Sequence, residues 1–179
     1  IILNILIGSI FVIIFDGVAK NKIGLLNHLE LPYILKILVG IIVIDFISYW
    51  THRLYHKWHL LWRLHRVHHS DTKMDSSTAF RAHPFDVFLD NGSVIIADSF
   101  FGKVFVTPNF HKIHHHQDQI YTDSNYGNVF IFWDKLFGTF KELPVDNIKY
   151  GLIEFEGTNK QSFWYSLISP FINIKRFDK

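Results

Sequence analysis

Residues 45–69 read DFISYWTHRLYHKWHLLWRLHRVHH, a stretch that starts in an apolar run and ends in a dense set of histidines. His52 and His56 are four residues apart, so on a helix their imidazoles share one face. Three more histidines follow at positions i, i+3 and i+4, which is again one helical face: His65, His68 and His69. The stretch therefore predicts two helical faces that present two and three imidazoles.

The same spacing recurs in a second window, 111–116, in His111, His114 and His115. Neutral imidazole is a good ligand for iron, zinc, copper and nickel. The eight imidazoles on these three faces are too many for one tetrahedral zinc site, and they predict two metal ions held close together. Without a metal, a packed face of neutral imidazoles would leave buried polar groups poorly satisfied, and protonated imidazoles would repel one another.

Three further side chains are candidates for an additional ligand or for a hydrogen bond to a ligand: His83, Asp45 and Asn125. Asp45 comes first because it lies on the same helical face as His52, and an acidic residue inside an apolar helix is functional by default. Three of the remaining histidines are not expected to be ligands. His28 is expected at the surface and His116 off the ligand face, while His59 shares the stripe of His52 and is expected at the membrane interface or hydrogen-bonded to a ligand. Most of the aspartates close to the histidine groups are expected at the solvated surface: Asp71, Asp75, Asp118, Asp123 and Asp134.

The composition of the whole chain excludes several classes of protein. Hydrophobic residues make up 49% and charged residues 19% of the 179 residues, which is not the composition of a disordered chain. The chain has no cysteine, which excludes disulfides, iron–sulfur clusters, thiolate zinc sites and cysteine nucleophiles. The formal charge of +2 is too small to indicate nucleic acid binding.

Two apolar runs, Ile1–Phe15 and Ile34–Trp50, predict membrane helices, with a buried helix of a soluble protein as the alternative. Beyond the second run come basic residues typical of a cytoplasmic flank: Arg53, Lys57, Arg63 and Arg66. Lys20 and Lys22, on the other side of that run, weaken this assignment without reversing it. The predicted fold is all-α, with integral membrane helices and a cytosolic helical cap that carries a histidine-ligated dimetal site.

The whole chain, residues 1–179, is expected to form a single domain with four regions. Residues 1–50 form the membrane helices, and residues 51–86 form the first histidine region. An apolar segment, 87–106, precedes the second histidine region and cytosolic tail at 107–179. The protein is therefore expected to be a multi-pass integral membrane protein with its metal site on the cytoplasmic side.

Several motifs resemble the fatty acid hydroxylase/sterol desaturase superfamily, and the resemblance covers roughly residues 34–171. The motifs are DFISYWTHRLYH at 45–56, LWRLHRVHHSD at 61–71, VTPNFHKIHH at 106–115, DSNYG at 123–127 and WDKLFGT at 133–139. The resemblance implies a membrane enzyme with a non-haem di-iron centre on its cytosolic face. It implies hydroxylation or desaturation of a fatty acyl chain or a sterol-like lipid with O2. Two electrons would come from a cytochrome b5-like or ferredoxin-like protein.

By motif match, the family's ligand roles fall on His52, His56, His65, His68, His69, His111, His114 and His115. The sequence departs from the family between RAHP at 81–84 and TPNFH at 107–111, where the family usually has more hydrophobic sequence and a further histidine motif. Here residues 85–106 leave room for one helix at most. The central segment is therefore expected to be shortened, which leaves open whether the chain is active.

Four other functions are alternatives to a di-iron oxidoreductase. A membrane zinc hydrolase needs a carboxylate base beside its ligands, but the HExxH motif is absent and the four glutamates are remote from the histidines. A metal-binding membrane protein or transporter without oxygenase activity would place polar ligands inside its spans, where only Asp45 fits. A haem carrier needs paired axial histidines instead of HxxHH groups. The fourth alternative is a catalytically incomplete remnant of the family.

Overall fold

The computed structural model describes residues 9, 12–14, 16–18, 20–73, 103–144, 146 and 148–172. These residues belong to two compact units, 1–44 and 45–179. The predictions for His83 and for most of the apolar segment 87–106 lie outside the described residues, as does most of the first apolar run.

The first unit contains α2 (Leu25–His28) and the N-terminal half of α3 (Tyr33–Lys57). At 25 residues, α3 is about 37 Å long, enough to cross a hydrocarbon core of about 30 Å. Within the described part of the chain it is the helix whose length and composition suit a membrane crossing. Only 11% of its apolar window is buried, whereas a core helix of a soluble protein would be mostly buried.

The predicted apolar run ended at Trp50, but α3 continues to Lys57 and carries His52 and His56 on its last two turns. This extension gives the first histidine pair the rigid helical frame that its spacing predicted. Lys57 also places a positive charge in the last turn, where it suits the negative end of the helix dipole.

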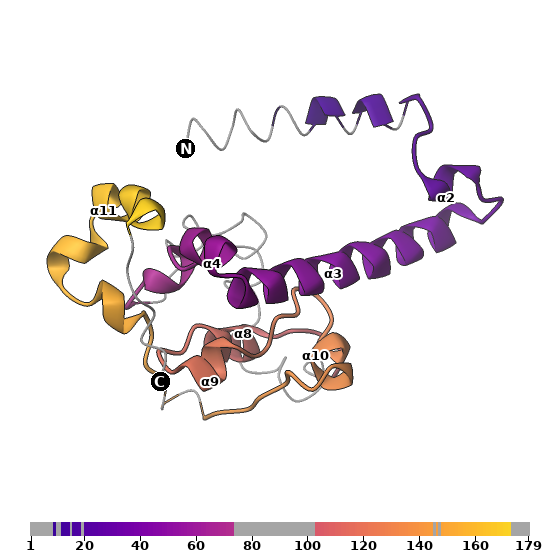
Figure 1. The fold of residues 1–179 in the computed structure, drawn as a ribbon. Helices are drawn as coiled ribbons and strands as arrows, with labels where there is room; N and C mark the ends of the chain where they lie inside the picture. The colour runs from indigo at the N-terminus through magenta and orange to yellow at the C-terminus, as the bar shows by residue number, and fades with distance from the viewer. Residues whose placement is uncertain are drawn as a thin grey trace. The chain divides into compact units, whose positions relative to one another are not determined.

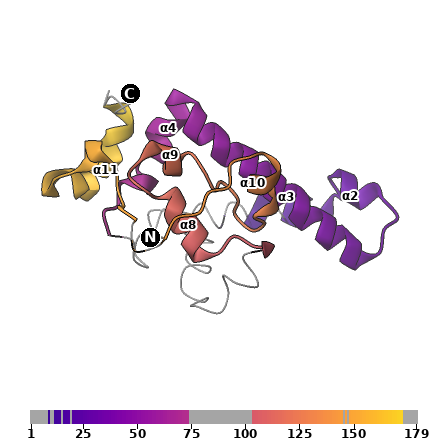
Figure 2. The same cartoon turned by 90° about the horizontal axis from the view of Figure 1, so that it is seen from below.

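The second unit consists of short helices, and the described residues form no strand, only the isolated bridges Phe105–Phe130 and His116–Tyr150. This helical character was predicted. After α3 the chain forms α4 (His59–His65), η1 (His68–Ser70), α8 (Pro108–His114), α9 (Gln119–Thr122), α10 (Phe132–Leu136), η4 (Ile153–Phe155), η5 (Thr158–Gln161), α11 (Phe163–Ile168) and η6 (Ser169–Phe171). Figures 1 and 2 show α8 and α9 beside the C-terminal end of α3, with α11 at the outer edge of the unit.

His111 and His114 lie on α8, and His115 directly follows its last residue. The residues at the start of α8 are ones that favour the beginning of a helix. Thr107 caps α8 by accepting a hydrogen bond from Phe110 N, and Pro108 occupies the first turn, where its missing N–H has no cost. His65, His68 and His69 were predicted to share one continuous helical face, but the structure divides them between two helices. α4 ends at His65, a turn follows at 66–67, and η1 begins at His68.

The interior of the second unit is unusually polar. A small apolar cluster joins Trp62 of α4 to Leu152 and Phe155, with Tyr165 packed against it. Over the described residues, buried polar or charged side chains are twice as numerous as buried apolar ones. Because burial of a polar group is costly unless it has a partner, this interior depends on its hydrogen bonds and on whatever the histidines bind.

Candidate metal centre

The structure brings the three predicted histidine faces together in one buried cluster. In a first group, the ring nitrogens of five histidines all lie within 4.8 Å of one another: His52, His56, His65, His69 and His114. A second group of the same compactness contains His68, His69 and His115. The two groups adjoin at His69. His111 lies at the edge of the second group, where its Nε2 is 3.1 Å from Nε2 of His115.

Main-chain carbonyls orient two of these rings. His52 Nδ1 donates to the carbonyl of Tyr126 at 3.0 Å, and His114 Nδ1 donates to that of Ser124 at 2.7 Å. Because a carbonyl only accepts hydrogen bonds, each Nδ1 must carry the ring's proton, and each Nε2 then has a free lone pair. In this tautomer Nε2 is the nitrogen available to a metal.

Several ring nitrogens of the cluster have no partner among the described residues. Nε2 of His52 and His114, and Nδ1 of His68 and His69, are buried and make no hydrogen bond. A buried polar atom without a partner costs about 1–3 kcal/mol. Four such atoms within one cluster of neutral imidazoles fit a bound transition metal, for which imidazole nitrogen is a preferred ligand.

A carboxylate orients a third ring. Asp123 Oδ1 lies 3.2 Å from His56 Nδ1, and its Oδ2 accepts a hydrogen bond from Lys57 Nζ at 3.2 Å. Histidine ligands commonly donate their second N–H to a carboxylate in this way. Lys57 is exposed, so Asp123 links the solvent-facing side of α3 to the buried cluster.

The loop that supplies both carbonyls is held by the fully buried Asp134. Its Oδ1 accepts from Tyr126 N and Thr139 Oγ1, at 2.8 and 2.7 Å, and its Oδ2 accepts from Gly127 N at 2.8 Å. A Cβ on Gly127 would lie only 2.7 Å from Phe130 O and 2.9 Å from Asp134 Oδ2, so glycine is required for this approach. Asp134 therefore positions the carbonyl of Tyr126 beneath His52.

Asp45 holds the other end of the same loop. Its carboxylate accepts hydrogen bonds from Val129 N at 2.9 Å, and from Phe130 N and Trp133 Nε1 at 3.0 Å each. The predicted contact between Asp45 and a histidine is thus replaced by contacts to the loop that carries the histidines' acceptors. Asp45 acts on the cluster through one intervening layer of main chain.

Asn125 also supports the loop, and both polar atoms of its side chain are hydrogen-bonded to main-chain groups outside the cluster. It adopts a positive φ of 50°. Its Nδ2 donates to Phe110 O and Lys141 O, while its Oδ1 accepts from Lys141 N at 2.8 Å. The predicted additional-ligand candidate is therefore a tether between α8 and the segment after α10.

Burial disfavours protonation of five of the imidazoles in the cluster. Burial lowers the pKa of four rings well below the ordinary 6.5: His65, His69, His114 and His115. Burial, reinforced by His111 and His56, lowers the pKa of His68 to about 3. Each of these imidazoles is therefore neutral and able to donate a lone pair to a metal.

Among the histidines and aspartates not expected to be ligands, two carboxylates support the cluster, while Asp75 lies outside the described residues. His28 and His59 are exposed, and His116 uses its Nδ1 to accept from Asp118 N at 2.8 Å. Asp123 and Asp134 were expected mostly at the surface, yet both support the site. Spacing could not identify them, because their partners are main-chain groups or lie far away in sequence.

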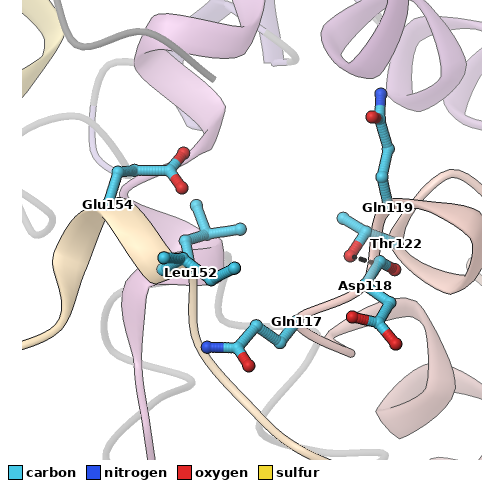
Figure 3. Close-up of a pocket in the computed structure, with 7 residues that line it drawn as sticks. Gln117, Asp118, Gln119, Thr122, Leu152 and Glu154 are labelled. Atoms are coloured by element: carbon cyan, nitrogen blue, oxygen red, sulfur yellow. Dashed lines mark hydrogen bonds between the residues drawn. The ribbon is translucent and has the colours of Figure 1, made fainter. Parts of the chain in front are cut away.

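A small cavity of about 120 Å³ lies outside the histidine cluster (Figure 3). Glu154 and Leu152 face it from one side, and the polar segment of Gln117, Asp118, Gln119 and Thr122 lines the other. None of its lining residues belongs to the two histidine groups, so this cavity is distinct from the candidate metal centre.

Comparison with known proteins gives the cluster a family context. Alkylglycerol monooxygenase of Caenorhabditis elegans is 32% identical over 150 residues, covering 66% of this chain and 30% of that protein. The human alkylglycerol monooxygenase is 29% identical, with coverages of 61% and 31%. Ornithine lipid hydroxylase OlsE of Rhizobium tropici is 27% identical, with coverages of 77% and 52%. The matches thus span about a third to a half of the length of these relatives. No solved structure matches the chain significantly.

The sequence profile of the fatty acid hydroxylase family matches residues 37–104 and 94–139. Together these segments cover more than half of the 179 residues and include the three histidine groups. The chain belongs to the fatty acid hydroxylase family.

Proposed function

We propose that this chain is a membrane-bound oxidoreductase that uses O2 to hydroxylate or desaturate a lipid, either a fatty acyl chain or a sterol-like molecule. The observation that carries the proposal is the buried histidine cluster in a chain of this family. Its relatives named as an alkylglycerol monooxygenase and an ornithine lipid hydroxylase support a lipid substrate.

The cluster suits two iron ions, held by His52, His56, His65, His68, His69, His111, His114 and His115. Iron bound there would supply the activation of O2 and the cleavage of an unactivated C–H bond, which amino-acid side chains alone cannot accomplish. The adjoining histidine groups, which share His69, support two ions instead of one.

Residues around the histidines orient their rings and set their tautomers for metal binding. The carbonyls of Ser124 and Tyr126 keep the protons of their partner rings on Nδ1, and Asp123 orients His56. Burial keeps His65, His68, His69, His114 and His115 neutral, so these rings need no deprotonation before a metal binds at neutral pH. The fully buried ring of Tyr126 packs against His52, His56 and His114, which would limit the access of water on that side of the cluster.

Electron delivery would come from outside the chain, from a cytochrome b5-like or ferredoxin-like protein. The exposed Lys57 offers a positive contact for an acidic donor, and through Asp123 it connects to His56. We place the chain in a membrane as a multi-pass protein with the cluster on the cytoplasmic side. The length and composition of α3, and the basic Arg53 and Lys57 at its C-terminal end, support this.

A second candidate is a family member that binds metal without oxidising lipid. The observation in its favour is the short interval between His83 and Thr107, which leaves little sequence for lining a lipid tunnel.

The test is oxygen incorporation. The full chain, reconstituted with iron, a reductant and a mixture of membrane lipids, would be supplied with 18O2, and the lipids would be analysed by mass spectrometry. A product heavier by one 18O atom indicates hydroxylation, and a loss of two hydrogens indicates desaturation. Unchanged lipids from a preparation that holds two irons would contradict the oxidoreductase and favour the second candidate.

A further inference from the structure

The C-terminal helical segment α11–η6 carries an apolar stripe that faces away from the protein. Five large apolar side chains recur at helical spacing and are strongly exposed: Phe163 (73%), Trp164 (71%), Leu167 (54%), Ile168 (49%) and Phe171 (80%). Positions i, i+1, i+4, i+5 and i+8 form one continuous face of a helix. Figures 1 and 2 both place α11 at the periphery of the second unit.

The inner face of this segment is more polar than the outer one. Tyr165 packs edge-to-face on Phe155 at 5.6 Å, while Ser166 is half-buried and Ser169 is fully buried. A helix on the surface of a water-soluble protein has the opposite arrangement, with its apolar face inward. An apolar patch of this kind marks a surface that meets another apolar phase.

Hydrogen bonds prevent the segment from turning its apolar face inward. The buried Arg66 donates to the carbonyl of Ser169 and, at 3.0 Å, to that of Ile172. Ser162 caps the start of α11 by accepting from Tyr165 N at 3.2 Å. Just before it, Gln161 Nε2 donates to the carbonyls of Ser70 and Phe155. The exposed stripe is therefore a fixed feature of the folded unit.

The composition of the segment indicates that a lipid bilayer covers the apolar stripe. Residues 157–177 contain no aspartate or glutamate, and basic residues flank the stripe: Lys160 before it, and Lys175 and Arg176 after it. Tryptophan and phenylalanine beside lysine and arginine are typical of helices that lie at the boundary between lipid headgroups and acyl chains. Anionic headgroups attract the flanking cations.

We propose that α11 and η6 are an interfacial anchor, whose stripe of Phe163, Trp164, Leu167, Ile168 and Phe171 inserts into the surface of a lipid bilayer. The anchor would hold the histidine-bearing unit at the membrane surface independently of α3. Membrane insertion of the anchor requires no metal and no catalytic activity. The anchor can therefore be tested independently of the proposed function.

The absence of native cysteine makes the test direct. A fluorophore is attached to Leu167→Cys or Phe171→Cys in the full chain, and the matched control carries it at Asp118→Cys, an exposed polar position. Each protein is reconstituted into vesicles of phosphatidylcholine and phosphatidylglycerol. Quenching by a lipid that carries a nitroxide on its acyl chain is then compared with quenching by aqueous iodide.

The anchor predicts several-fold stronger quenching by the lipid nitroxide than by iodide at positions 167 and 171, and the reverse at 118. Iodide quenching at 167 and 171 equal to that at 118 would overturn the proposal. Shielding from both quenchers, with excimer emission from pyrene attached at position 167, would also overturn it, because a second copy of the chain would then cover the stripe. Two labelled positions guard against a local effect of either substitution.

Discussion

Individual hydrogen bonds decide which nitrogen of each histidine is available to a metal. His52 and His114 use Nδ1 on carbonyl groups and keep Nε2 for the cluster. The loop that carries these carbonyls is in turn held by two carboxylates, Asp45 and Asp134, whose hydrogen-bond partners lie in the loop. Residues one layer away from the imidazoles therefore control the geometry of the candidate site.

Asp134→Asn tests this control. An asparagine has one acceptor oxygen, and its amide would face one of the main-chain N–H groups of Tyr126 and Gly127 that the carboxylate now accepts. We expect the free energy of unfolding to fall by about 1–3 kcal/mol. We also expect metal affinity to fall roughly 10–100-fold. Denaturant titration and competitive metal titration measure the two effects, and exposed Asp118→Asn is the control. Unchanged metal affinity would show that the loop does not position the ligands.

Asp123→Ala tests whether the orientation of His56 by Asp123 contributes to metal affinity. It removes the carboxylate beside His56 Nδ1, and we expect metal affinity to fall by about 10-fold or more. The neighbouring surface change Lys57→Ala leaves that contact in place and should leave metal affinity unchanged, since Lys57 is exposed. Equal losses in the two variants, measured by competitive titration, would contradict a role for Asp123 in orienting His56.

At the scale of elements, the cluster is made by bringing α3, α4, η1 and α8 together so that their imidazoles face one another. This arrangement makes the metal-free protein sensitive to acid. The unfolded chain binds protons as the pH falls below about 6.5, whereas the folded chain resists because burial lowers the pKa of His65, His69, His114 and His115. The free energy of unfolding should therefore decrease as the pH falls from about 6.5 toward 3.

The expected slope is about 1.4 kcal/mol per pH unit for each such histidine. Asp134, whose pKa burial raises, acts in the opposite direction but is one group against several. Denaturant titration of the metal-free chain between pH 7.5 and 4.5 measures the slope. A free energy of unfolding that stays constant over this range would mean that the imidazoles are not buried together.

The sequence predicted these elements well where the spacing is local. The HxxxH and HxxHH patterns gave the helical faces of α3 and α8 because residues three and four apart share a face by geometry alone. The break between His65 and His68 was not predicted. Arg66 lies at this break and is held by carbonyls of Ser169 and Ile172, about a hundred residues later in the chain, a contact that local spacing does not reveal.

The same limit applies to the supporting residues. Asp45 was predicted to matter because a carboxylate in an apolar helix is unusual, but its partners are the main-chain N–H groups of Val129 and Phe130. The sequence placed Arg66 among residues flanking the membrane, whereas the structure buries it beneath η6. In both cases the residue type indicated importance, and tertiary contacts determined the role.

On the scale of the whole molecule, the polar interior implies that metal binding contributes to the stability of the folded state. Buried apolar side chains are outnumbered by polar ones in the described part of the second unit, and several buried ring nitrogens there have no hydrogen-bond partner. A ligand that binds only the folded state stabilises it by about 4 kcal/mol when its free concentration is 1,000 times its Kd. We therefore expect chelation to lower the melting temperature by several degrees and iron to restore it. Equal melting temperatures with and without metal would contradict this coupling.

The most direct test of the central claim is the iron content of the detergent-purified full chain, expressed with iron available, beside the variant His68→Ala/His69→Ala. The double substitution removes one imidazole that the two histidine groups share and another from the second group. We predict about two irons per chain in the wild type and their loss in the variant. Little bound metal, or zinc alone in equal amounts in both proteins, would contradict a histidine di-iron centre.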